Sequence, residues 1–310
     1  MVISQADQPT VDIVIPCYNH GRFLTEAVES ALSQTYPHVT VTVIDDGSTD
    51  DTPAVAARFG NRIRYVRKDN GGLSSARNAG ICATNGEFLV FLDADDYLHH
   101  DSVRCHIEAV RQQPSASIIY GDFRYVDEAG QEIGRDGPID FGDDAFHGLL
   151  AGLVPPVHAL TIRRPAIVNA GGFDVSIRWH EDLDLWLRIA TAGHRFARVD
   201  FPGAFYRKYA GTMTRQTLEM AHWGLVVLRR TKQYHRDCLL CRDLLPRMLC
   251  HWKRSYATAI RQEVMTTRPH GDRGRHVVKG LRHLLHNPSV ARYLLTGLRS
   301  WIRERTLSAT

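Results

Sequence analysis

Three carboxylates that directly follow an apolar run are the residues with the clearest chemical potential. The stretch FLVFLDADDYL at 88–98 places Asp93, Asp95 and Asp96 immediately after five apolar residues. Carboxylates this close repel one another unless positive charge lies among them. Mg²⁺ and Mn²⁺ prefer oxygen ligands and often bridge carboxylates to phosphates. The spacing therefore indicates a divalent-cation site, although an Asp-rich turn capping the next helix would have similar residues.

Two other polar stretches could contact a nucleotide. In IDDGSTDDT (44–52), Asp45 and Asp46 end an apolar run, where carboxylates can accept hydrogen bonds from a ribose hydroxyl or a base N–H. In NGGLSSARNAG (70–80), a glycine pair precedes a helix start and Arg77, and both helix amides and arginine can bind phosphate. Turn formation alone would also account for the first stretch, and the second is a weak signal by itself.

The elements that must position these residues alternate between strand and helix. From residue 11 to about 120, short β-rich runs alternate with helical segments of about ten residues, which predicts βαβ units and a mainly parallel sheet. The polar loops CYNHG, DDGSTDD and DADD each follow a predicted strand, so they share the sheet edge where ligands bind such folds. Residues 121–175 are less regular. A helix begins at about Asp182 and ends at Gly193, and the pattern beyond residue 212 is helical.

Composition and charge bound the class of protein. The content of 44% hydrophobic and 23% charged residues is typical of a globular protein, and no apolar run approaches the length of a membrane span. The first ten residues lack the features of a signal peptide, and six scattered cysteines suit a reducing compartment, so we expect a cytoplasmic protein. Residues 211–310 carry 19 basic and 6 acidic residues, whereas residues 1–210 carry 19 and 28. This asymmetry predicts two parts with different tasks.

Five stretches in order carry a resemblance to a known family. VIPCYNHGRFLTEAVESALSQTYP, VTVIDDGSTDDT, NGGLSSARNAG, GEFLVFLDADD and HEDLDLWLR resemble the family 2 nucleotide-sugar glycosyltransferases over roughly residues 10–210. The resemblance implies the α/β GT-A fold, with a Rossmann-like, mainly parallel central sheet flanked by helices, and a C-terminal helical extension. We therefore predict a catalytic domain at 1–212, with a nucleotide-binding half at about 10–120 and an acceptor-side half at about 121–212. A basic helical region would follow at 213–310.

The resemblance also implies roles for the polar residues. Asp182 would be the general base, with Glu181 beside it. In the metal loop formed by Asp93, Asp95 and Asp96, Asp96 would contact the cation most directly and Asp95 would lie near the ribose. The nucleotide-side residues would be Pro16, Tyr18, Asn19, Asp45, Asp46 and Arg77, with Asp46 pairing with the base and Arg77 lying near the diphosphate.

These roles imply a metal-dependent, inverting sugar transfer. Mn²⁺ or Mg²⁺ would offset charge on the leaving diphosphate, while Asp182 takes the proton of the attacking hydroxyl in a single displacement. The resemblance implies a UDP-sugar as the donor, with GDP- and dTDP-sugars as alternatives. The acceptor would be a glycan or lipid-linked hydroxyl in cell-surface polysaccharide synthesis. Two alternative hypotheses for the function are a non-catalytic sugar-nucleotide-binding module on the same fold and a haloacid-dehalogenase-like phosphohydrolase.

One position departs from the family pattern. Many relatives carry a histidine in a stretch resembling YRxH after the base helix, and this chain has YRKY at 206–209, with Tyr209 at that position. The third metal contact is therefore open. Sequence alone does not assign it to His158, His180 or His194.

The C-terminal region offers two further signals. SVARYLLTGLRSWIRERT (289–306) is basic and amphipathic, so it could lie on the anionic inner face of a membrane or pack on the protein with its basic face in solvent. His235, Cys238, Cys241 and Cys250 include a Cys-x-x-Cys pair, which we interpret as buried packing residues in a Leu-rich helix rather than a zinc site. The region has no recognisable nucleic-acid-binding signature, so we expect no nucleic-acid partner.

Overall fold

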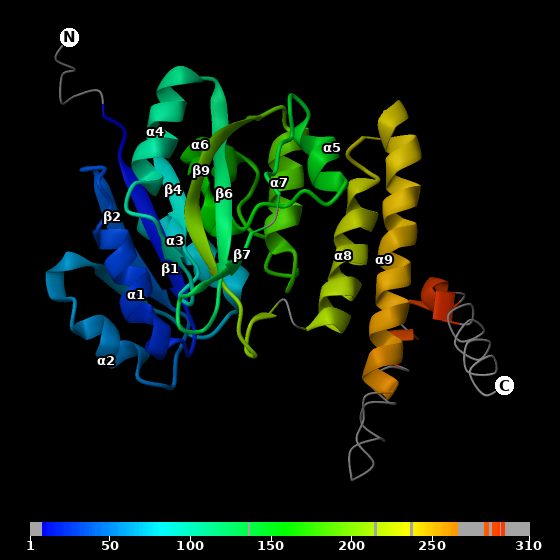
Figure 1. Ribbon diagram of the computed structural model, residues 1–310, viewed down its shortest axis with the longest axis horizontal. Helices are drawn as coiled ribbons and strands as arrows, with labels where there is room; N and C mark the ends of the chain where they lie inside the picture. Colours follow the sequence, from blue (N-terminus) through cyan, green and yellow to red (C-terminus); the bar gives the residue numbers. More distant parts are fainter. Residues whose placement is uncertain are drawn as a thin grey trace. The chain divides into compact units, whose positions relative to one another are not determined.

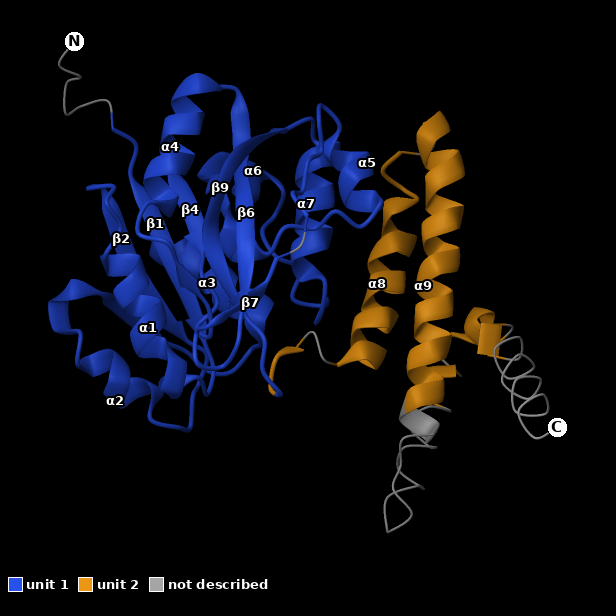
Figure 2. Cartoon of the chain, viewed as in Figure 1, with its two compact units in different colours: residues 1–210 blue, residues 211–310 orange. Residues whose placement is uncertain are grey.

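Strand β1 (Val11–Cys17) is the first element of a nine-stranded sheet, and all seven of its residues are buried. The computed structural model describes residues 8–135, 137–213, 216–235, 238–265, 282–284, 287–291 and 293–294. The chain divides into two compact units, residues 1–210 and 211–310 (Figure 2). The predicted domain boundary lies at residue 212.

The sheet of the first unit is mainly parallel. Its strand order is β3-β2-β1-β4-β8-β6-β9-β5, with β7 paired to β6. The β1–β2, β2–β3, β1–β4 and β6–β9 pairs are parallel, whereas β8 pairs antiparallel with both β4 and β6. The strands after β1 are β2 (Val39–Asp45), β3 (Arg64–Arg67), β4 (Phe88–Phe91), β5 (Tyr97–Leu98), β6 (Ala116–Val126), β7 (Glu132–Gly134), β8 (Leu160–Arg163) and β9 (Arg195–Arg207).

Helices cover both faces of this sheet (Figure 1). They are α1 (Gly21–Leu32), α2 (Thr52–Ala57), α3 (Leu73–Ala83), α4 (Ser102–Gln112), α5 (Ala145–Leu150), α6 (Arg164–Asn169) and α7 (Glu181–Thr191). Side chains alternate across a strand, so β1 packs on two cores at once. Ile13 and Ile15 share a hydrophobic cluster with residues of α1, α2 and α4. Val14 points to the opposite face, toward Gly80 of α3.

The architecture confirms the fold class predicted from the sequence. Helices alternate with the parallel strands, as the βαβ pattern requires. Asp45 ends β2, and the DADD stretch directly follows β4. The irregular region 121–175 contains the end of β6, the short strands β7 and β8 and the short helices α5 and α6. The polar loops after β1, β2 and β4 therefore lie at the carboxyl edge of neighbouring parallel strands.

The second unit is helical where the structure describes it. Helices α8 (Thr217–Thr231) and α9 (Leu239–Met265) lie side by side (Figure 1). They approach closely, because a Cβ atom on Gly224 of α8 would lie 2.6 Å from the Trp252 ring of α9. No described helix is long and apolar enough to cross a membrane. Most of the predicted amphipathic segment 289–306 lies outside the described residues.

The contact between α3 and β1 yields a test of the core. A Cβ on Gly80 would lie 2.2 Å from Cγ1 of Val14, so we expect Gly80→Ala to lower the free energy of unfolding by about 1–3 kcal/mol, as overpacking does. In a Val14→Ala background the same change should be neutral or stabilising, because the clashing methyl groups are gone and alanine favours helix. Thermal midpoints of the four proteins measure this.

Gly137→Ala is the matched control for that test. A Cβ at Gly137 meets no atom within 4 Å, so its thermal midpoint should not change. An equal effect of Gly80→Ala in both backgrounds would contradict the close contact.

Candidate active site

The loop that follows β4 folds back on itself and buries its last carboxylate. The Asp96 amide donates to the Asp93 carbonyl (3.0 Å), which closes a turn, and the Asp96 side chain is 1% exposed. Its Oδ1 accepts a hydrogen bond from the Arg207 amide of β9 (2.7 Å). The loop is therefore fixed at both ends, by β4 and by β9.

The other oxygen of Asp96 faces a buried histidine. His158 Nδ1 lies 3.2 Å from Asp96 Oδ2, and neither ring nitrogen of His158 nor this oxygen has a hydrogen-bond partner in the protein. Buried polar atoms without partners are costly, so this group of atoms fits a bound cation. Burial lowers the His158 pKa to about 4, so the imidazole is neutral and able to ligate. Ligand atoms of Asp93, Asp96 and His158 all lie within 4.8 Å of one another.

The chemistry of this cluster fits a divalent cation. Burial, followed by the charges of Asp95 and Asp93, raises the pKa of Asp96 well above its usual range. A cation among these groups would stabilise the ionised carboxylates and occupy the unpaired atoms. The predicted metal residues Asp93 and Asp96 are thus together. His158 joins them from the short segment that leads into β8. The sequence offered it only as one of three candidate histidines.

A buried arginine connects the metal loop to the start of α7. Arg77 of α3 is 2% exposed, and its guanidinium donates to Asp93 (2.8 Å) and to Glu181 (2.6 Å). Burial raises the pKa of Glu181, whereas Arg77 opposes that rise. An arginine does not give up its proton, so Arg77 stabilises the ionised form of Glu181. Arg77 was predicted to lie near a diphosphate; in this structure two carboxylates occupy its guanidinium.

Asp182 follows Glu181 in the first turn of α7. The residue before the helix, His180, has a left-handed backbone (φ 61°), which sets the direction in which α7 leaves the loop. Asp182 is partly exposed, and its Oδ1 accepts from the Leu183 amide (2.7 Å). Glu181 is buried against Arg77. Of the two neighbouring carboxylates, Asp182 is therefore the one accessible to a substrate.

Tyr209 contacts the metal loop from a position where many relatives have histidine. Its hydroxyl donates to Asp95 Oδ2 (3.0 Å) and lies 3.3 Å from His20 Nε2. The ring packs on Phe23 of α1 with centroids 5.1 Å apart. Tyr209 thus orients Asp95 through a hydrogen bond, a role that differs from metal ligation.

The carboxylates of Asp45 and Asp46 are largely occupied by protein donors. Asp45 accepts from the Ser48 amide (2.7 Å) and from the Tyr65 hydroxyl. Asp46 forms an ion pair with Lys68 (2.5 Å) and accepts from the amides of Gly71 and Gly72, at 3.0 and 2.7 Å. These contacts hold the 45–48 turn and the glycine pair in place. Any nucleotide contact of Asp46 would be added to these bonds or would replace them.

The loop after β1 is joined to the loop after β2. Asn19 has a left-handed backbone (φ 56°), its amide donates to Ser48 Oγ (3.0 Å), and its side chain accepts from the Thr49 amide (2.7 Å). Tyr18 beside it is 47% exposed. Pro16 lies within buried β1, so it can act on a ligand only through the shape of this loop. The loop predicted to contact the nucleotide first is therefore held in place by hydrogen bonds and exposes one aromatic ring, that of Tyr18.

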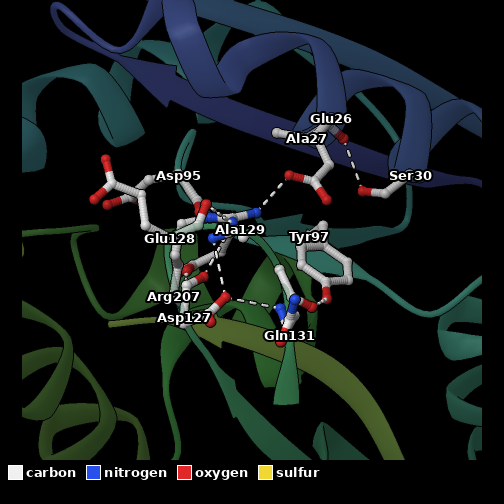
Figure 3. A network of polar contacts seen from close by, with 12 residues as sticks. Glu26, Ala27, Ser30, Asp95, Tyr97, Asp127, Glu128, Ala129, Gln131 and Arg207 are labelled. Atoms are coloured by element: carbon white, nitrogen blue, oxygen red, sulfur yellow. Dashed lines mark hydrogen bonds and ion pairs between the residues drawn. The ribbon is translucent and has the colours of Figure 1, made fainter. Parts of the chain in front are cut away.

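Arg207 of β9 is the site residue that the sequence did not reveal. Its guanidinium is 2% exposed and donates to the Asp95 carbonyl (2.8 Å), to the carbonyls of Asp127 (3.1 Å) and Glu128 (2.8 Å), and to Glu26 of α1 (Figure 3). One side chain thus joins α1, the metal loop and the turn between β6 and β7. Its position two residues before Tyr209, within the YRKY stretch, was the available signal.

Comparisons with known proteins identify relatives of this arrangement. The model of "Glycosyl transferase family 2" matches residues 12–166. An uncharacterized glycosyltransferase of Rickettsia felis is 35% identical over 191 residues, covering 58% of this chain and 31% of the relative. The chondroitin synthase of Escherichia coli is 31% identical over 190 residues, covering 60% of this chain and 27% of that protein. The chain therefore spans about a third or less of the length of these two relatives.

Solved structures share the fold at low sequence identity. Staphylococcus aureus TarS has a TM-score of 0.59 and 17% identity, covering 85% of this chain and 45% of that one. The mannosyltransferase PcManGT of Pyrobaculum calidifontis, in complex with GDP-Man and Mn²⁺, also has a TM-score of 0.59 and 17% identity, covering 93% and 85%. Both likenesses support the GT-A architecture.

The Arg207 contacts predict a large loss of stability on truncation. Arg207→Ala removes the donor of three partly buried backbone carbonyls and of the half-exposed Glu26 carboxylate, so we expect the free energy of unfolding to fall by about 1–3 kcal/mol. Arg22 is the matched control, because it pairs with Glu128 on the same turn while both side chains are more than half exposed. Arg22→Ala should cost less than about 1 kcal/mol. Equal thermal midpoints for the two variants would contradict the role of Arg207.

Proposed function

Because this chain belongs to glycosyl transferase family 2, we propose that it moves a sugar from a nucleotide-sugar donor to a hydroxyl of a glycan or lipid-linked acceptor. The observation that carries the proposal is the convergence of Asp93, Asp96 and His158 beside Asp182 and Glu181, joined through Arg77. Carboxylates for a cation and an accessible carboxylate for a proton are the two groups that such a transfer requires.

Asp93, Asp96 and His158 would hold Mn²⁺ or Mg²⁺. The cation would offset the charge that grows on the leaving diphosphate. Of these two ions, Mn²⁺ suits a set of two carboxylates and one imidazole better than Mg²⁺ does, since imidazole is a softer ligand than carboxylate. Asp95, held by Tyr209, would lie beside the metal and accept a hydrogen bond from the ribose. Arg77 would position Asp93 rather than bind phosphate directly.

Asp182 would act as the general base. It would accept the proton of the acceptor hydroxyl while that oxygen attacks the anomeric carbon opposite the leaving group. Glu181 is occupied by Arg77 and would stabilise the start of α7. A single displacement of this kind inverts the anomeric configuration and requires no covalent intermediate on the protein.

The nucleotide would lie along the loops after β1 and β2. Asn19, Asp45 and Asp46 hold these loops together, and the exposed ring of Tyr18 is available to a base or ribose. We propose a UDP-sugar as donor, with GDP- and dTDP-sugars as the competing classes. TarS structures in complex with UDP and UDP-GlcNAc, and the GDP-Man complex of PcManGT, support a nucleotide-sugar at this type of fold.

Calorimetric titration tests the donor site. We expect one of UDP, GDP and dTDP to bind in Mn²⁺ and to lose most of its affinity in EDTA. Asp96→Ala and His158→Ala should each weaken Mn²⁺ binding, followed directly by electron paramagnetic resonance, by at least about tenfold. The matched control is His106→Ala, because His106 is equally buried but hydrogen-bonds to Thr161 (2.8 Å) and is not one of the clustered ligands.

Two results would contradict the donor-site proposal. Absence of binding by every nucleotide under both conditions would remove the transferase function and leave a different use of the fold. Mn²⁺ binding that His158→Ala and His106→Ala affect equally would remove His158 from the metal site.

A second variant separates the base from the binding site. Asp182→Asn should keep nucleotide and Mn²⁺ affinity but reduce nucleotide release from the matching nucleotide-sugar by about 10²–10⁴-fold, since an amide cannot accept the proton. Asp143→Asn, an exposed carboxylate in the same unit, should retain full turnover. A turnover unchanged in Asp182→Asn would assign the base to another residue.

A further inference from the structure

The turn between α8 and α9 gathers three soft metal ligands in the second unit. His235 follows α8, Cys238 directly precedes α9, and Cys241 lies in the first turn of α9. Within the part of the chain that the structure describes, their ligand atoms, one imidazole nitrogen and two sulfurs, all lie within 4.8 Å of one another. Neither cysteine forms a disulfide, so no disulfide accounts for their approach.

Packing explains only part of this arrangement. Cys241 is buried on the same face of α9 as Leu245 and Leu249, as expected for a small apolar residue. The two residues between the cysteines are exposed leucines, Leu239 at 76% and Leu240 at 60%. An apolar helix face therefore does not account for Cys238. It also does not account for an imidazole lying beside both sulfurs.

Backbone hydrogen bonds place Cys238 at the start of α9. The Cys238 amide lies 3.4 Å from the His235 carbonyl, and the Cys238 carbonyl accepts from the Arg242 amide (3.1 Å), which starts the helix. Both sulfurs thus belong to the N-terminal end of a 27-residue helix. The first amides of a helix have no acceptors within it, and the helix dipole stabilises negative charge at that end.

We propose that His235, Cys238 and Cys241 bind a structural zinc ion that fixes the turn between α8 and α9. Two thiolates and an imidazole are donors that Zn²⁺ prefers, whereas Mg²⁺ and Mn²⁺ prefer sites dominated by oxygen and rarely take thiolates. Binding releases the two thiol protons and involves no redox change. Zinc is tetrahedral in such sites, so water or another side chain completes the coordination. This proposal is an alternative to the interpretation of these cysteines as packing residues.

A fixed turn has a structural purpose in this unit. Helices α8 and α9 approach so closely at Gly224 and Trp252 that a change in the angle between them would separate these residues or make them clash. A metal ion at one end of the helix pair limits that angle. The site is independent of the sugar-transfer proposal, because it uses none of the residues at the sheet edge.

The full-length protein, purified without chelator, provides the test. Elemental analysis should find about one zinc ion per chain, retained through dialysis. Cobalt substitution should give thiolate-to-metal charge-transfer and tetrahedral d–d bands, and X-ray absorption should show two sulfur ligands. Cys238→Ser and Cys241→Ser should each lower zinc affinity, measured by chelator competition, by at least about tenfold. His235→Ala should do the same while leaving both sulfurs in place.

Matched controls keep the result specific. Cys250→Ser changes a third cysteine of α9, whose sulfur contacts the Tyr293 hydroxyl (3.6 Å), and should retain zinc. Asp96→Ala should also retain it, which separates this site from the oxygen-rich cluster. A zinc content that the three ligand variants do not change would overturn the proposal. The absence of a cobalt–thiolate band from reduced, cobalt-substituted protein would also overturn the proposal. So would the finding of iron and sulfide in place of zinc.

Discussion

The buried guanidinium of Arg207 is the interaction on which the architecture of the site depends. Burying a charge is costly unless it is paired and hydrogen-bonded, and Arg207 satisfies this with backbone carbonyls of two loops and the carboxylate of Glu26. Its amide also fixes Asp96. Because these partners come from α1, the metal loop and the β6–β7 turn, a shift of any of them breaks a bond to the same side chain. The loop is thereby preorganised for a ligand.

Arg77 solves a second electrostatic problem, the crowding of carboxylates. Asp93 and Glu181 would repel each other across the interior, and Arg77 lies between them. Among the described residues, Asp96 and Asp182 form no such ion pair with an arginine: Asp96 Oδ2 faces the imidazole of His158, and Asp182 accepts from the Leu183 amide. The protein therefore neutralises the carboxylates that shape the site. It leaves charge for a cation and a proton where the proposed chemistry would occur.

The sequence predicts the parts of the site that lie at the ends of strands. It does not predict contacts between residues far apart in the sequence, which depend on how the strands pair. Asp45 and the DADD loop could be placed at one sheet edge because parallel strands end there together. Arg207 and Asp96 lie 111 positions apart and meet because β5, which begins directly after Asp96, pairs antiparallel with β9, Tyr97 opposite Phe205. A strand of two residues leaves no signal in hydrophobic periodicity. His158 lies in the irregular segment before β8, so the sequence could name it only as one of three candidate histidines.

The geometry also changes how the departure at Tyr209 is understood. A histidine there could ligate a metal, whereas the phenol of Tyr209 donates to Asp95, and a neutral phenol is a poor ligand. Without a histidine at position 209, a cation held only by the carboxylates of the loop would be bound more weakly. His158 approaches Asp96 from the segment leading into β8 and offers an imidazole nitrogen. A cation shared by Asp96 and His158 would keep one nitrogen in the ligand set. It would leave Asp95, held by Tyr209, free to contact the donor instead.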